Sequence, residues 1–467
     1  MFTRARLYVL CVFALIFAGC AAPPAATSAS GQAAAATAAT DRVVVLISVD
    51  GLAGFYFDDP KAEMPNIRRL AEQGASARTM KASNPTVTWP NHTTLVTGAH
   101  PARHGVVGNN YFDRAKRERV TLVGDPVFDK DQIVKVPTIY DIAHAHGLTT
   151  ASVYWPATRN ASTLTWTIPE VRKHAQLDQY TTPSLRAELV EAGIPLERTL
   201  SAGKGQPVSN EERDEIHTQA FQLILSKHRP RLALLHLVRV DHDQHRYGPR
   251  TPQAYAAIAH SDELVGRVWD QLQREFPGKA TLLVVSDHGV SPIEREIRPN
   301  IILRDAGLLE DPRAIHVVVQ GGSAMIYVLD ESNRASILAR IRKAFEGQEG
   351  IDTIAGPGEL SAFGVAEPNV DPHAPDLMLF AKEGYVFGDT ASGELPFVEK
   401  PERGGSHGHS ASLPSLHAMF VAWGSGIRAG AALGDIENTS VAPTIARLLN
   451  LPMPDADGKP LIAALSE

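Results

Sequence analysis

Carboxylates and imidazoles recur in this sequence shortly after apolar runs. The runs 43–47 and 281–285 are followed by Asp50 and by the adjacent pair Asp287 and His288. In open α/β sheets, ligands bind beyond the carboxyl ends of the strands. We therefore expect these three side chains to converge in one cleft.

Two further groups extend the pattern. The run 232–240 leads to Asp241, with His245 four residues later, and His407 stands in the glycine-rich segment 404–409. The chain has 18 histidines, and a lone histidine is usually a surface or structural residue. The joint recurrence of acids with adjacent histidines is much stronger evidence, and it indicates one shared metal site.

Cysteine usage limits the chemistry of that site. The only cysteines are Cys11 and Cys20, so the rest of the chain offers no thiolate ligand and no disulfide. Carboxylates and imidazoles without thiolates suit zinc in a catalytic site, which keeps one position open for substrate.

The elements that must position these residues alternate between strand and helix. The β-branched run 43–47 is typical of a strand buried on both faces. The alternation predicts an α/β fold with a central, mostly parallel sheet and helices on both faces. Strands are expected at 43–47, 148–155, 232–240, 281–285, 316–320, 324–329, 377–381 and 419–423, and helices at 65–73, 210–227, 251–276, 334–345 and 440–449.

The first forty residues differ in composition from the rest. Residues 1–20 have the basic start and short apolar run of an export signal, and their end, Phe17-Ala18-Gly19-Cys20, resembles the lipobox of bacterial lipoproteins. An ordinary cleaved signal with an incidental Cys20 is the alternative. Residues 21–41, rich in Ala, Ser, Thr and Pro, are expected to be a flexible tether. The chain would then be exported to the periplasm and anchored to the outer membrane through Cys20.

Residues 42–467 are expected to form a single catalytic domain, with insertions at about 111–129, 170–205 and 357–375. The formal net charge of −7 disfavours binding to a long nucleic-acid backbone, although a small nucleotide at a metal remains compatible with it. Nothing after the first two dozen residues is long and apolar enough to span a bilayer, so membrane contact is expected only through the lipid anchor.

Several segments, in order along the chain, resemble the nucleotide pyrophosphatase/phosphodiesterase family of the alkaline phosphatase superfamily. The resemblance covers about 43–461 and implies an alkaline-phosphatase-like core. The segment 83–92, which reads Ser-Asn-Pro-Thr-Val-Thr-Trp-Pro-Asn-His, resembles the nucleophile loop of the family. The other matching segments are 97–107, 154–156, 241–249, 286–289, 406–408, 441–446, 451–452 and 457–458.

The resemblance implies a role for each matching residue. Thr88 would be the nucleophile, Asn109 would donate to a phosphoryl oxygen, and Trp89 would stack on a nucleotide base. Asn110 competes with Asn109, and a core or rim position is the alternative for Trp89. Two Zn²⁺ per chain would be held, one by Asp50, Thr88, Asp287 and His288, the other by Asp241, His245 and His407.

The implied chemistry explains the residue types. A threonine hydroxyl is almost fully protonated at neutral pH, and coordination to zinc makes its alkoxide accessible. The second zinc would neutralise the leaving-group oxygen, and Asn109 would stabilise charge on the phosphoryl oxygens. A phosphothreonine intermediate, hydrolysed by zinc-activated water, would follow.

The expected activity is release of 5′-nucleotides from nucleotide derivatives. The rivals are a zinc phosphomonoesterase, a diesterase of another phosphate diester such as a lipid headgroup, and a ligand-binding surface lipoprotein without turnover. Arg159, after the segment 154–156, keeps the monoesterase open. A second stacking wall could come from Tyr180 or Trp166. The sequence leaves the oligomeric state open.

Neighbouring residues are expected to play supporting parts. His92, His100 and His104 would hold the nucleophile loop through hydrogen bonds, whereas His242 and Asp243 would either support the metal ligands from outside or face solvent. At other positions the chain departs from the family. Gln244 stands where members often have glycine, and Arg239-Val240 stands where many have Glu-Pro. His409 and Ser410 stand where the family usually has an aromatic residue and an aspartate.

Overall fold

The structure is a computed structural model that describes residues 41–124, 128–200, 208–311 and 313–466. The expected export signal, Cys20 and all but the last residue of the expected tether lie outside these residues.

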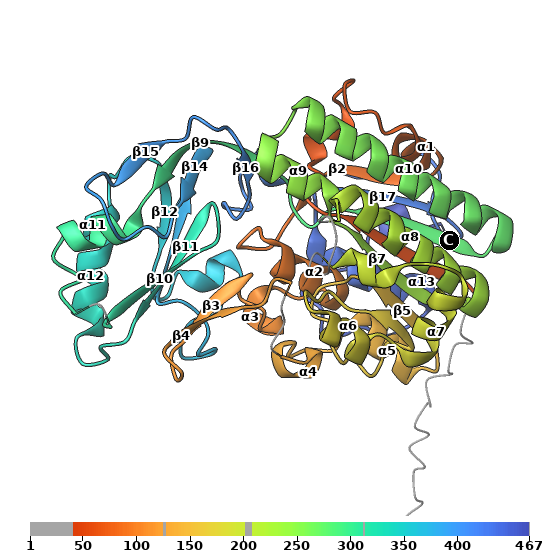
Figure 1. The fold of residues 1–467 in the computed structure, drawn as a ribbon, viewed down its shortest axis with the longest axis horizontal. Helices are drawn as coiled ribbons and strands as arrows, with labels where there is room; N and C mark the ends of the chain where they lie inside the picture. The colour runs from red at the N-terminus through yellow and green to blue at the C-terminus, as the bar shows by residue number, and fades with distance from the viewer. Residues whose placement is uncertain (1–40, 125–127, 201–207, 312, 467) are drawn as a thin grey trace, which may run out of the picture. The chain divides into compact units, whose positions relative to one another are not determined.

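The largest sheet of the fold has nine strands. It lies in the right-hand part of the view, where β2, β5, β7 and β17 are labelled (Figure 1). Its strand order is β18-β2-β17-β8-β1-β7-β5-β6, with β19 paired to β2. Six of its strand pairs are parallel, and only the two pairs made by β17 are antiparallel. The strands are β1 (Val43–Val49), β2 (Ala75–Lys81), β5 (Thr150–Val153), β6 (Trp166–Ile168), β7 (Leu232–Leu237), β8 (Ala280–Val285), β17 (Ala418–Gly424), β18 (Ala431–Ala432) and β19 (Ile436–Glu437).

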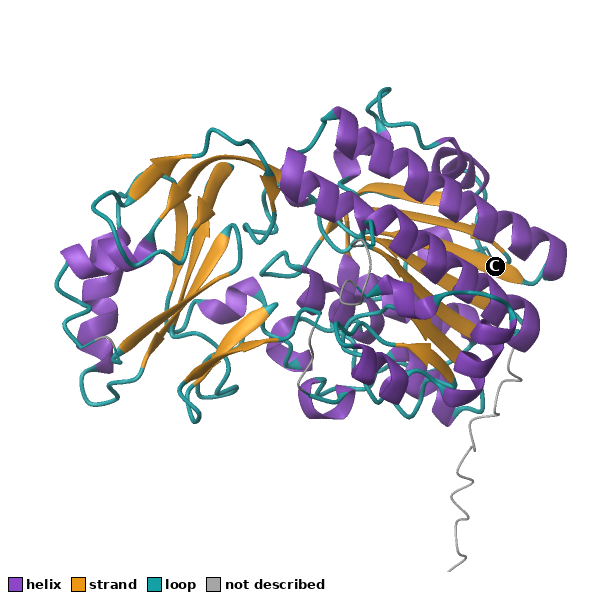
Figure 2. Ribbon diagram, viewed as in Figure 1, coloured by secondary structure: helices purple, strands orange, loops and turns teal. Residues whose placement is uncertain are grey.

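The central strand β1 shows why this sheet needs cover on both faces. All seven of its residues are buried. Because successive side chains of a strand point to opposite faces, Val45 and Ile47 enter one hydrophobic cluster, whereas Val44 and Leu46 enter another. The expected mostly parallel sheet between two layers of helices is confirmed (Figure 2).

The helices divide between these two clusters. Apolar residues of α1, α8 and α10 pack on one face of the sheet, and those of α2, α5 and α13 on the other. The helices are α1 (Pro65–Gln73), α2 (Thr88–Thr97), α3 (Pro101–His104), α4 (Lys130–Ile133), α5 (Ile139–Ala145), α6 (His174–Tyr180), α7 (Pro183–Glu191), α8 (Asn210–His228), α9 (Arg239–Tyr247), α10 (Pro252–Glu275), α11 (Pro299–Asp305), α12 (Arg334–Phe345) and α13 (Val441–Leu449).

One expected boundary is wrong. The run 232–240 does not continue as a strand to Val240, because β7 ends at Leu237 and α9 begins at Arg239. The buried carboxylate of Asp214 accepts hydrogen bonds from the backbone N–H groups of Val238 and Arg239, at 3.0–3.1 Å. A side chain of α8 thereby satisfies the free donors where α9 starts.

A separate antiparallel sheet contains three of the expected strands. It has the order β10-β11-β13-β12, and α11 and α12 pack on one of its faces. The sequence pattern did not distinguish these strands from the central sheet, because buried strands read alike in both. They are β10 (Ile315–Val319), β11 (Ser323–Val328), β12 (Ile351–Ala355) and β13 (Leu377–Ala381).

Smaller strands complete the fold. The strand β9 (Ser291–Ile297) pairs with β14 (Gly384–Phe387), β15 (Phe397–Glu399) and β16 (Gly405–Ser406), and the hairpin of β3 (Asn110–Asp113) and β4 (Glu118–Thr121) lies in the first expected insertion. The second expected insertion is not a mere surface excursion, because Leu185 and Leu189 of α7 are buried in the core of the central sheet.

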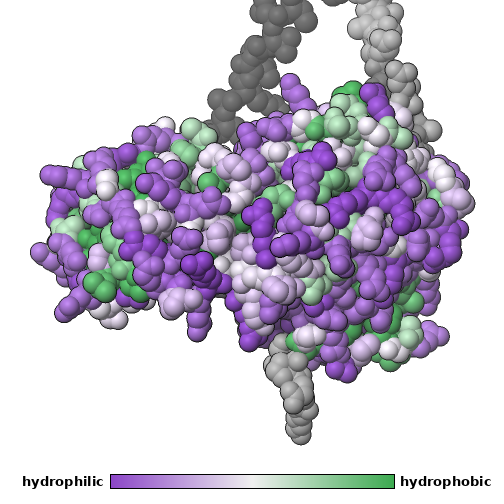
Figure 3. Space-filling view, turned by 90° about the horizontal axis from the view of Figure 1, so that it is seen from above, coloured by the Kyte–Doolittle hydropathy of each residue, from purple (hydrophilic) through white to green (hydrophobic). Residues whose placement is uncertain are grey.

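Among the described residues, none of the helices combines the length and apolar character needed to cross a bilayer. Figure 3 shows one face of the molecule, on which hydrophilic residues predominate and hydrophobic residues form only small groups. The described residues that are visible on that face therefore form no broad apolar patch of the kind that marks a large docking surface.

Candidate metal centre and phosphoryl site

Two neighbouring strands deliver the first group of candidate ligands. Asp50 directly follows β1, and Asp287 and His288 follow the parallel strand β8, so all three lie at one edge of the sheet. The Nε2 of His288 lies 3.5 Å from Asp50 Oδ1 and 3.1 Å from Asp287 Oδ2. The structure thus brings together the three residues that the sequence assigned to one cation.

Helix α9 delivers most of the second group. Asp241 and His245 stand four residues apart and so share a face of the helix, with His245 Nε2 at 3.3 Å from Asp241 Oδ2. The Nε2 of His407, in the loop after β16, lies 3.0 Å from that of His245 and 3.7 Å from Asp241 Oδ1. These three residues also converge as expected.

The two groups adjoin each other. The rings of His288 and His407 stack with their centroids 3.8 Å apart, and ligand atoms of Asp241, His288 and His407 all lie within 4.8 Å of one another. Gly51 links the groups through the backbone, because its N–H donates to Asp287 Oδ1 at 3.1 Å and a Cβ there would lie 3.0 Å from Asp241 Cβ. Six candidate ligands therefore surround one small volume.

The hydrogen bonds of the three imidazoles fix which ring nitrogen faces that volume. The Nδ1 of His245 lies 2.9 Å from the Gly405 carbonyl oxygen, that of His407 3.0 Å from Thr86 O, and that of His288 2.9 Å from Gly289 O. A carbonyl oxygen can only accept, so each Nδ1 carries the proton of the neutral ring. When the rings are neutral, each Nε2 presents a lone pair to the centre, as metal-binding histidines do.

The buried polar atoms of the site fit divalent cations. Asp50 Oδ1, Asp241 Oδ1, Asp287 Oδ2 and His288 Nε2 are all buried without a hydrogen-bond partner. Buried polar atoms are normally paired, and orphaned carboxylate oxygens facing bare imidazole nitrogens are the donor set that binds such ions. The residues present therefore fit a metal centre.

Electrostatics point the same way. Burial, reinforced by Asp287 and Asp241, raises the pKa of Asp50 well above its ordinary value, and burial also raises the pKa of Asp287. In the pair on α9, burial alone would raise the pKa of Asp241 and lower that of His245, but the attraction between the two residues outweighs it. Asp241 raises the pKa of His245 to about 9, and His245 is the main cause of the lowered pKa of Asp241. Closely spaced carboxylates repel one another when ionised, and a cation between them removes that cost.

The expected nucleophile starts a helix beside this centre. Thr88 is the first residue of α2, the N-cap is Val87, and Thr88 Oγ1 makes no hydrogen bond among the described residues. Its loop touches both groups: Thr86 O contacts His407 Nδ1, and Thr88 O lies 2.9 Å from His92 Nδ1, which is 3.4 Å from Asp287 Oδ2. The hydroxyl is therefore free, at a helix N-terminus that favours bound phosphate.

The structure also brings Asn109 to this loop. Its Oδ1 accepts a hydrogen bond from the Trp89 backbone N–H at 2.9 Å, and its own N–H donates to Gln320 Oε1 at 3.1 Å. Its Nδ2 has no hydrogen-bond partner among the described residues and can donate to a phosphoryl oxygen. For the competing Asn110, the contact with Gln320 runs through the carbonyl oxygen.

Trp89 lies elsewhere than the family resemblance implied. Its side chain is fully buried among residues such as Val106 and Tyr111, and its indole N–H donates to Glu170 Oε2 at 3.0 Å. The expected stacking on a nucleotide base is not met in this structure, because no part of the indole is exposed. The core position, which was the alternative, is the one observed.

The two candidates for a second stacking wall already have partners. Trp166 stacks on His228 with the ring centroids 4.3 Å apart, and Tyr180 lies under the guanidinium of Arg159, 4.8 Å from its ring centroid. Neither is free to face a base without losing these contacts.

The supporting histidines behave as expected. His92 contacts Thr88 O, His100 Nδ1 lies 2.9 Å from Ser83 Oγ, and His104 Nε2 lies 3.1 Å from Thr94 Oγ1. These contacts brace the loop and helix that carry Thr88. His242 has a side chain that is 59% exposed, so it faces solvent.

Sequence reasoning missed or undervalued other residues around the site. Gln244, noted only as a departure from the family, is buried and donates to Gly51 O at 2.9 Å. Glu170 and Gln320 were not considered, and no local sequence signal marks them. His236 could have been noticed, because it is the only polar residue in the run Leu-Ala-Leu-Leu-His-Leu of β7.

Comparisons with known proteins identify the family of the chain. The sequence profile of the type I phosphodiesterase / nucleotide pyrophosphatase family matches residues 44–410. Human ectonucleotide pyrophosphatase/phosphodiesterase family member 7 is 22% identical over 430 residues, covering 89% of this chain and 81% of that protein. Human family member 1 is 24% identical over 87% of this chain, which spans only 40% of the length of that relative.

Solved structures show the same fold. An inactive variant of murine ectonucleotide pyrophosphatase / phosphodiesterase 5 in complex with AMP superimposes with a TM-score of 0.68 and 20% sequence identity, covering 91% of this chain and all of the other. The expected α/β fold with an alkaline-phosphatase-like core is confirmed. From the profile match over most of its length, the chain belongs to the type I phosphodiesterase / nucleotide pyrophosphatase family of hydrolases.

Proposed function

We propose that the protein is a two-zinc phosphodiesterase/nucleotide pyrophosphatase that uses Thr88 as its nucleophile and releases 5′-nucleotides from nucleotide derivatives. The observation that carries the proposal is the convergence of three imidazole Nε2 atoms and three carboxylates beside the loop that bears a free threonine hydroxyl. The relatives named as nucleotide pyrophosphatases, and the related structure with AMP, support a nucleotide substrate.

Each residue of the site would have a distinct task. Asp50, Asp287 and His288 would hold one cation and Asp241, His245 and His407 the other. These ions would supply Lewis-acid stabilisation of the charge on the attacking and leaving oxygens. Thr88 Oγ1 would lose its proton to water and bond to phosphorus as the bond to the leaving oxygen breaks, and the leaving group would depart with the electron pair of that bond. The product is a phosphothreonine that still carries the nucleoside. Water would then attack the same phosphorus, break its bond to Thr88 Oγ1 and return a proton to that oxygen, which releases the 5′-nucleotide.

Asn109 would orient and stabilise the phosphoryl group. Its Oδ1 is fixed by the Trp89 N–H, which turns Nδ2 outward as a donor. The first turn of α2 adds the positive end of a helix dipole at the same place. Both features would favour the charge that develops on the equatorial oxygens during in-line displacement.

The rival phosphomonoesterase is disfavoured by the contacts of Arg159. Its Nε donates to Asp129 Oδ1 at 2.7 Å, and its guanidinium lies over the ring of Tyr180. An arginine engaged in this way is not free to grip the additional charge of a phosphate monoester.

Rates with Thr88→Ala and Thr88→Ser test the nucleophile. The substrates are a nitrophenyl diester of thymidine monophosphate and nitrophenyl phosphate, and acid quenching traps the phosphorylated enzyme. We expect diester turnover in the wild type, a trapped phosphoryl group on Thr88, and loss of both with alanine but not with serine. Unchanged hydrolysis by Thr88→Ala would refute the covalent route.

The cellular setting is also part of the proposal. Residues 1–20 would direct export to the periplasm, and a lipid on Cys20 would anchor the chain to the outer membrane through the tether 21–41. Metabolic labelling with a radioactive fatty acid, compared between wild type and Cys20→Ser, tests the anchor. Equal labelling of the two proteins would rule it out.

A further inference from the structure

A buried histidine next to the metal centre has no role in the scheme above. His236 stands in β7, a strand whose other residues are all leucine or alanine, and it is 1% exposed. Burying an imidazole in an aliphatic core is unfavourable unless its nitrogens find partners. The partners of His236 therefore indicate why the site has a histidine there.

Both ring nitrogens of His236 contact acceptors. Nε2 lies 3.0 Å from Asp50 Oδ2, and Nδ1 lies 3.1 Å from the carbonyl oxygen of Tyr154. The contact with Asp50 is a hydrogen bond whichever partner carries the proton, because a protonated Nε2 donates to the carboxylate and a protonated carboxyl donates to Nε2. When Asp50 is ionised beside a cation, His236 is the donor, at the edge of the central sheet.

This contact makes the two oxygens of Asp50 unequal. Oδ2 is occupied by His236, whereas Oδ1 is buried without a hydrogen-bond partner and lies 3.5 Å from His288 Nε2. Rotation of the carboxylate would break the bond to His236. The free oxygen is therefore held on the side of the candidate ligands.

Neighbouring rings keep His236 itself in place. The ring of His92 packs against the ring of His236 with the two centroids 4.1 Å apart. The ring of Tyr154 lies with its centroid 6.0 Å from that of His236, and the two ring planes make an angle of 27°. His217 stacks in turn on Tyr154 at 4.4 Å, and neither of its nitrogens has a hydrogen-bond partner. His217 thus shares the buried, aromatic setting of His236 but touches no candidate ligand.

We infer that His236 is a positioning residue of the metal centre, which fixes the Asp50 carboxylate so that Oδ1 is the oxygen offered to the cation. The inference rests on the proposed function. Partners of this kind around metal ligands are worth about 10- to 100-fold in metal affinity. The loss on removing His236 should be confined to the cation that Asp50 binds.

Zinc affinity of the full chain tests the inference. Metal-free wild type, His236→Leu, His236→Gln and His217→Leu are titrated with zinc against a chromophoric chelator. We expect the wild type to bind two zinc ions, and His236→Leu to bind one of the two with roughly 10- to 100-fold lower affinity. His236→Gln should recover much of this affinity, because its amide can donate to Asp50. His217→Leu should bind zinc like the wild type.

The outcomes separate this inference from the function on which it rests. A wild type that binds no zinc would overturn the proposed function. If the wild type binds two ions, the proposed function stands. The role of His236 would then be overturned if His236→Leu bound zinc with wild-type affinity. It would also be overturned if His217→Leu and His236→Gln weakened zinc binding as much as His236→Leu does. Leucine suits β7, and His236→Met carries the same test if the leucine variant does not fold.

Discussion

At the scale of single residues, the site is defined by which atoms of each side chain already have partners. His245, His288 and His407 all bond a carbonyl oxygen through Nδ1 and direct Nε2 toward the other candidate ligands. Asn109 commits Oδ1 to the Trp89 N–H and leaves Nδ2 for a ligand. In each of these side chains, a hydrogen bond to one polar atom thus fixes the orientation of the other polar atom, which is the one that would contact metal or substrate.

Replacing Asn109 should impair turnover far more than replacing its neighbour. We expect Asn109→Ala to lower kcat by about 10²- to 10³-fold, because one donor to the developing charge is lost. Asn109→Asp keeps the acceptor for the Trp89 N–H but loses the donor, so it should be comparably slow. The matched control Asn110→Ala should stay near wild type, since only its carbonyl contacts Gln320. A slower Asn110→Ala than Asn109→Ala would contradict the assignment.

A buried carboxyl next to the nucleophile loop should make stability depend on pH. Burial raises the pKa of Glu170 to about 7, despite opposition from Arg172 and the Trp89 indole. The folded state binds the proton of Glu170 more tightly than the unfolded chain does. The stabilisation that this proton gives is therefore complete below about pH 4.5 and is lost as the pH rises through 7. Glu170→Gln cannot titrate but can still accept from the indole.

Urea unfolding of the metal-free proteins between pH 4.5 and 8 measures this effect. The free energy of unfolding of the wild type should fall relative to that of Glu170→Gln by up to about 3 kcal/mol over this range. A constant difference between the two proteins would show that Glu170 is already ionised in the folded state at pH 5.

At the scale of elements, the ligands come from strand ends and helix starts that other elements hold. Asp214 of α8 caps α9, which carries Asp241 and His245. The turn between β10 and β11 supports the remaining ligand, because the Gly322 N–H donates to His407 O at 2.7 Å and the Gln320 side chain reaches Asn109. The antiparallel sheet therefore braces both the metal centre and the phosphoryl site.

Gly408 should be intolerant of a side chain for the same reason. It has a φ of +93°, and a Cβ there would lie 1.7 Å from the Gln320 carbonyl oxygen. Gly347 has a φ of +72° with nothing within 4 Å of such a Cβ, so it is a matched control. We expect Gly347→Ala to lose only the backbone cost of about 1 kcal/mol.

Gly408→Ala should lose more stability than that and should also weaken zinc binding, since the clash must displace the loop that carries His407. Thermal unfolding and chelator competition on both variants measure the two effects. Zinc affinity in Gly408→Ala equal to that of Gly347→Ala would show that the turn of β10 and β11 does not hold the ligand.

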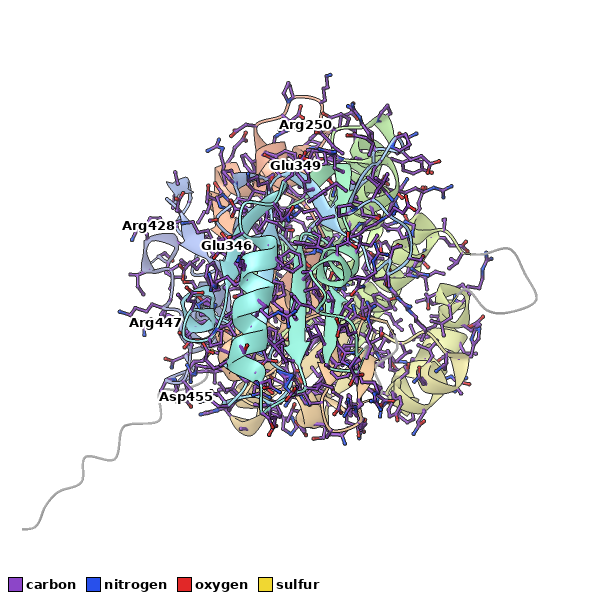
Figure 4. The ribbon with its side chains drawn as sticks, turned by 90° about the vertical axis from the view of Figure 1, so that its left-hand side faces the viewer. Arg250, Glu346, Glu349, Arg428, Arg447 and Asp455 are labelled. Atoms are coloured by element: carbon purple, nitrogen blue, oxygen red, sulfur yellow. The ribbon has the colours of Figure 1, made fainter. Side chains whose placement is uncertain are left out.

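At the scale of the whole molecule, exposed charges of both signs lie close together on the surface. Figure 4 shows Arg250, Arg428 and Arg447 in the same view as Glu346, Glu349 and Asp455, so this side presents both signs. The net charge of −7 and this mixed surface offer no track for a long nucleic-acid backbone. Carboxylates also gather at the metal centre, where Asp50, Asp241 and Asp287 lie among the candidate ligands.

Chelation should therefore destabilise the entire fold. Ions that bind only the folded state stabilise it by about 4 kcal/mol at a thousandfold excess over Kd. Removing them should lower the Tm by several degrees, and zinc should restore it. Asp287→Asn is the informative variant, because it removes one buried charge and keeps an oxygen for the Gly51 N–H.

Calorimetry with and without chelator makes the comparison. Metal-free Asp287→Asn should melt above the metal-free wild type, since repulsion with Asp50 is relieved, and its response to zinc should be smaller. A Tm of the wild type that does not change on chelation would exclude a stabilising metal centre.

The sequence by itself determined which residues could bind metal and where they stand on the chain. Apolar runs are readable because burial on both faces demands them, so the ends of β1 and β8 identified Asp50, Asp287 and His288, and the spacing of four on α9 linked Asp241 to His245. Thr88 and Asn109 came from the family resemblance, whose motifs record local backbone geometry.

Only the tertiary structure decided the rest, because it depends on contacts between residues far apart in the chain. Three such contacts are the hydrogen bond of Trp89 with Glu170, that of Gln320 with Asn109, and that of His236 with Asp50. They span 81, 211 and 186 residues. No periodicity or motif encodes such pairings. They arise when the packed sheets and helices bring each polar atom to the one partner that its burial requires.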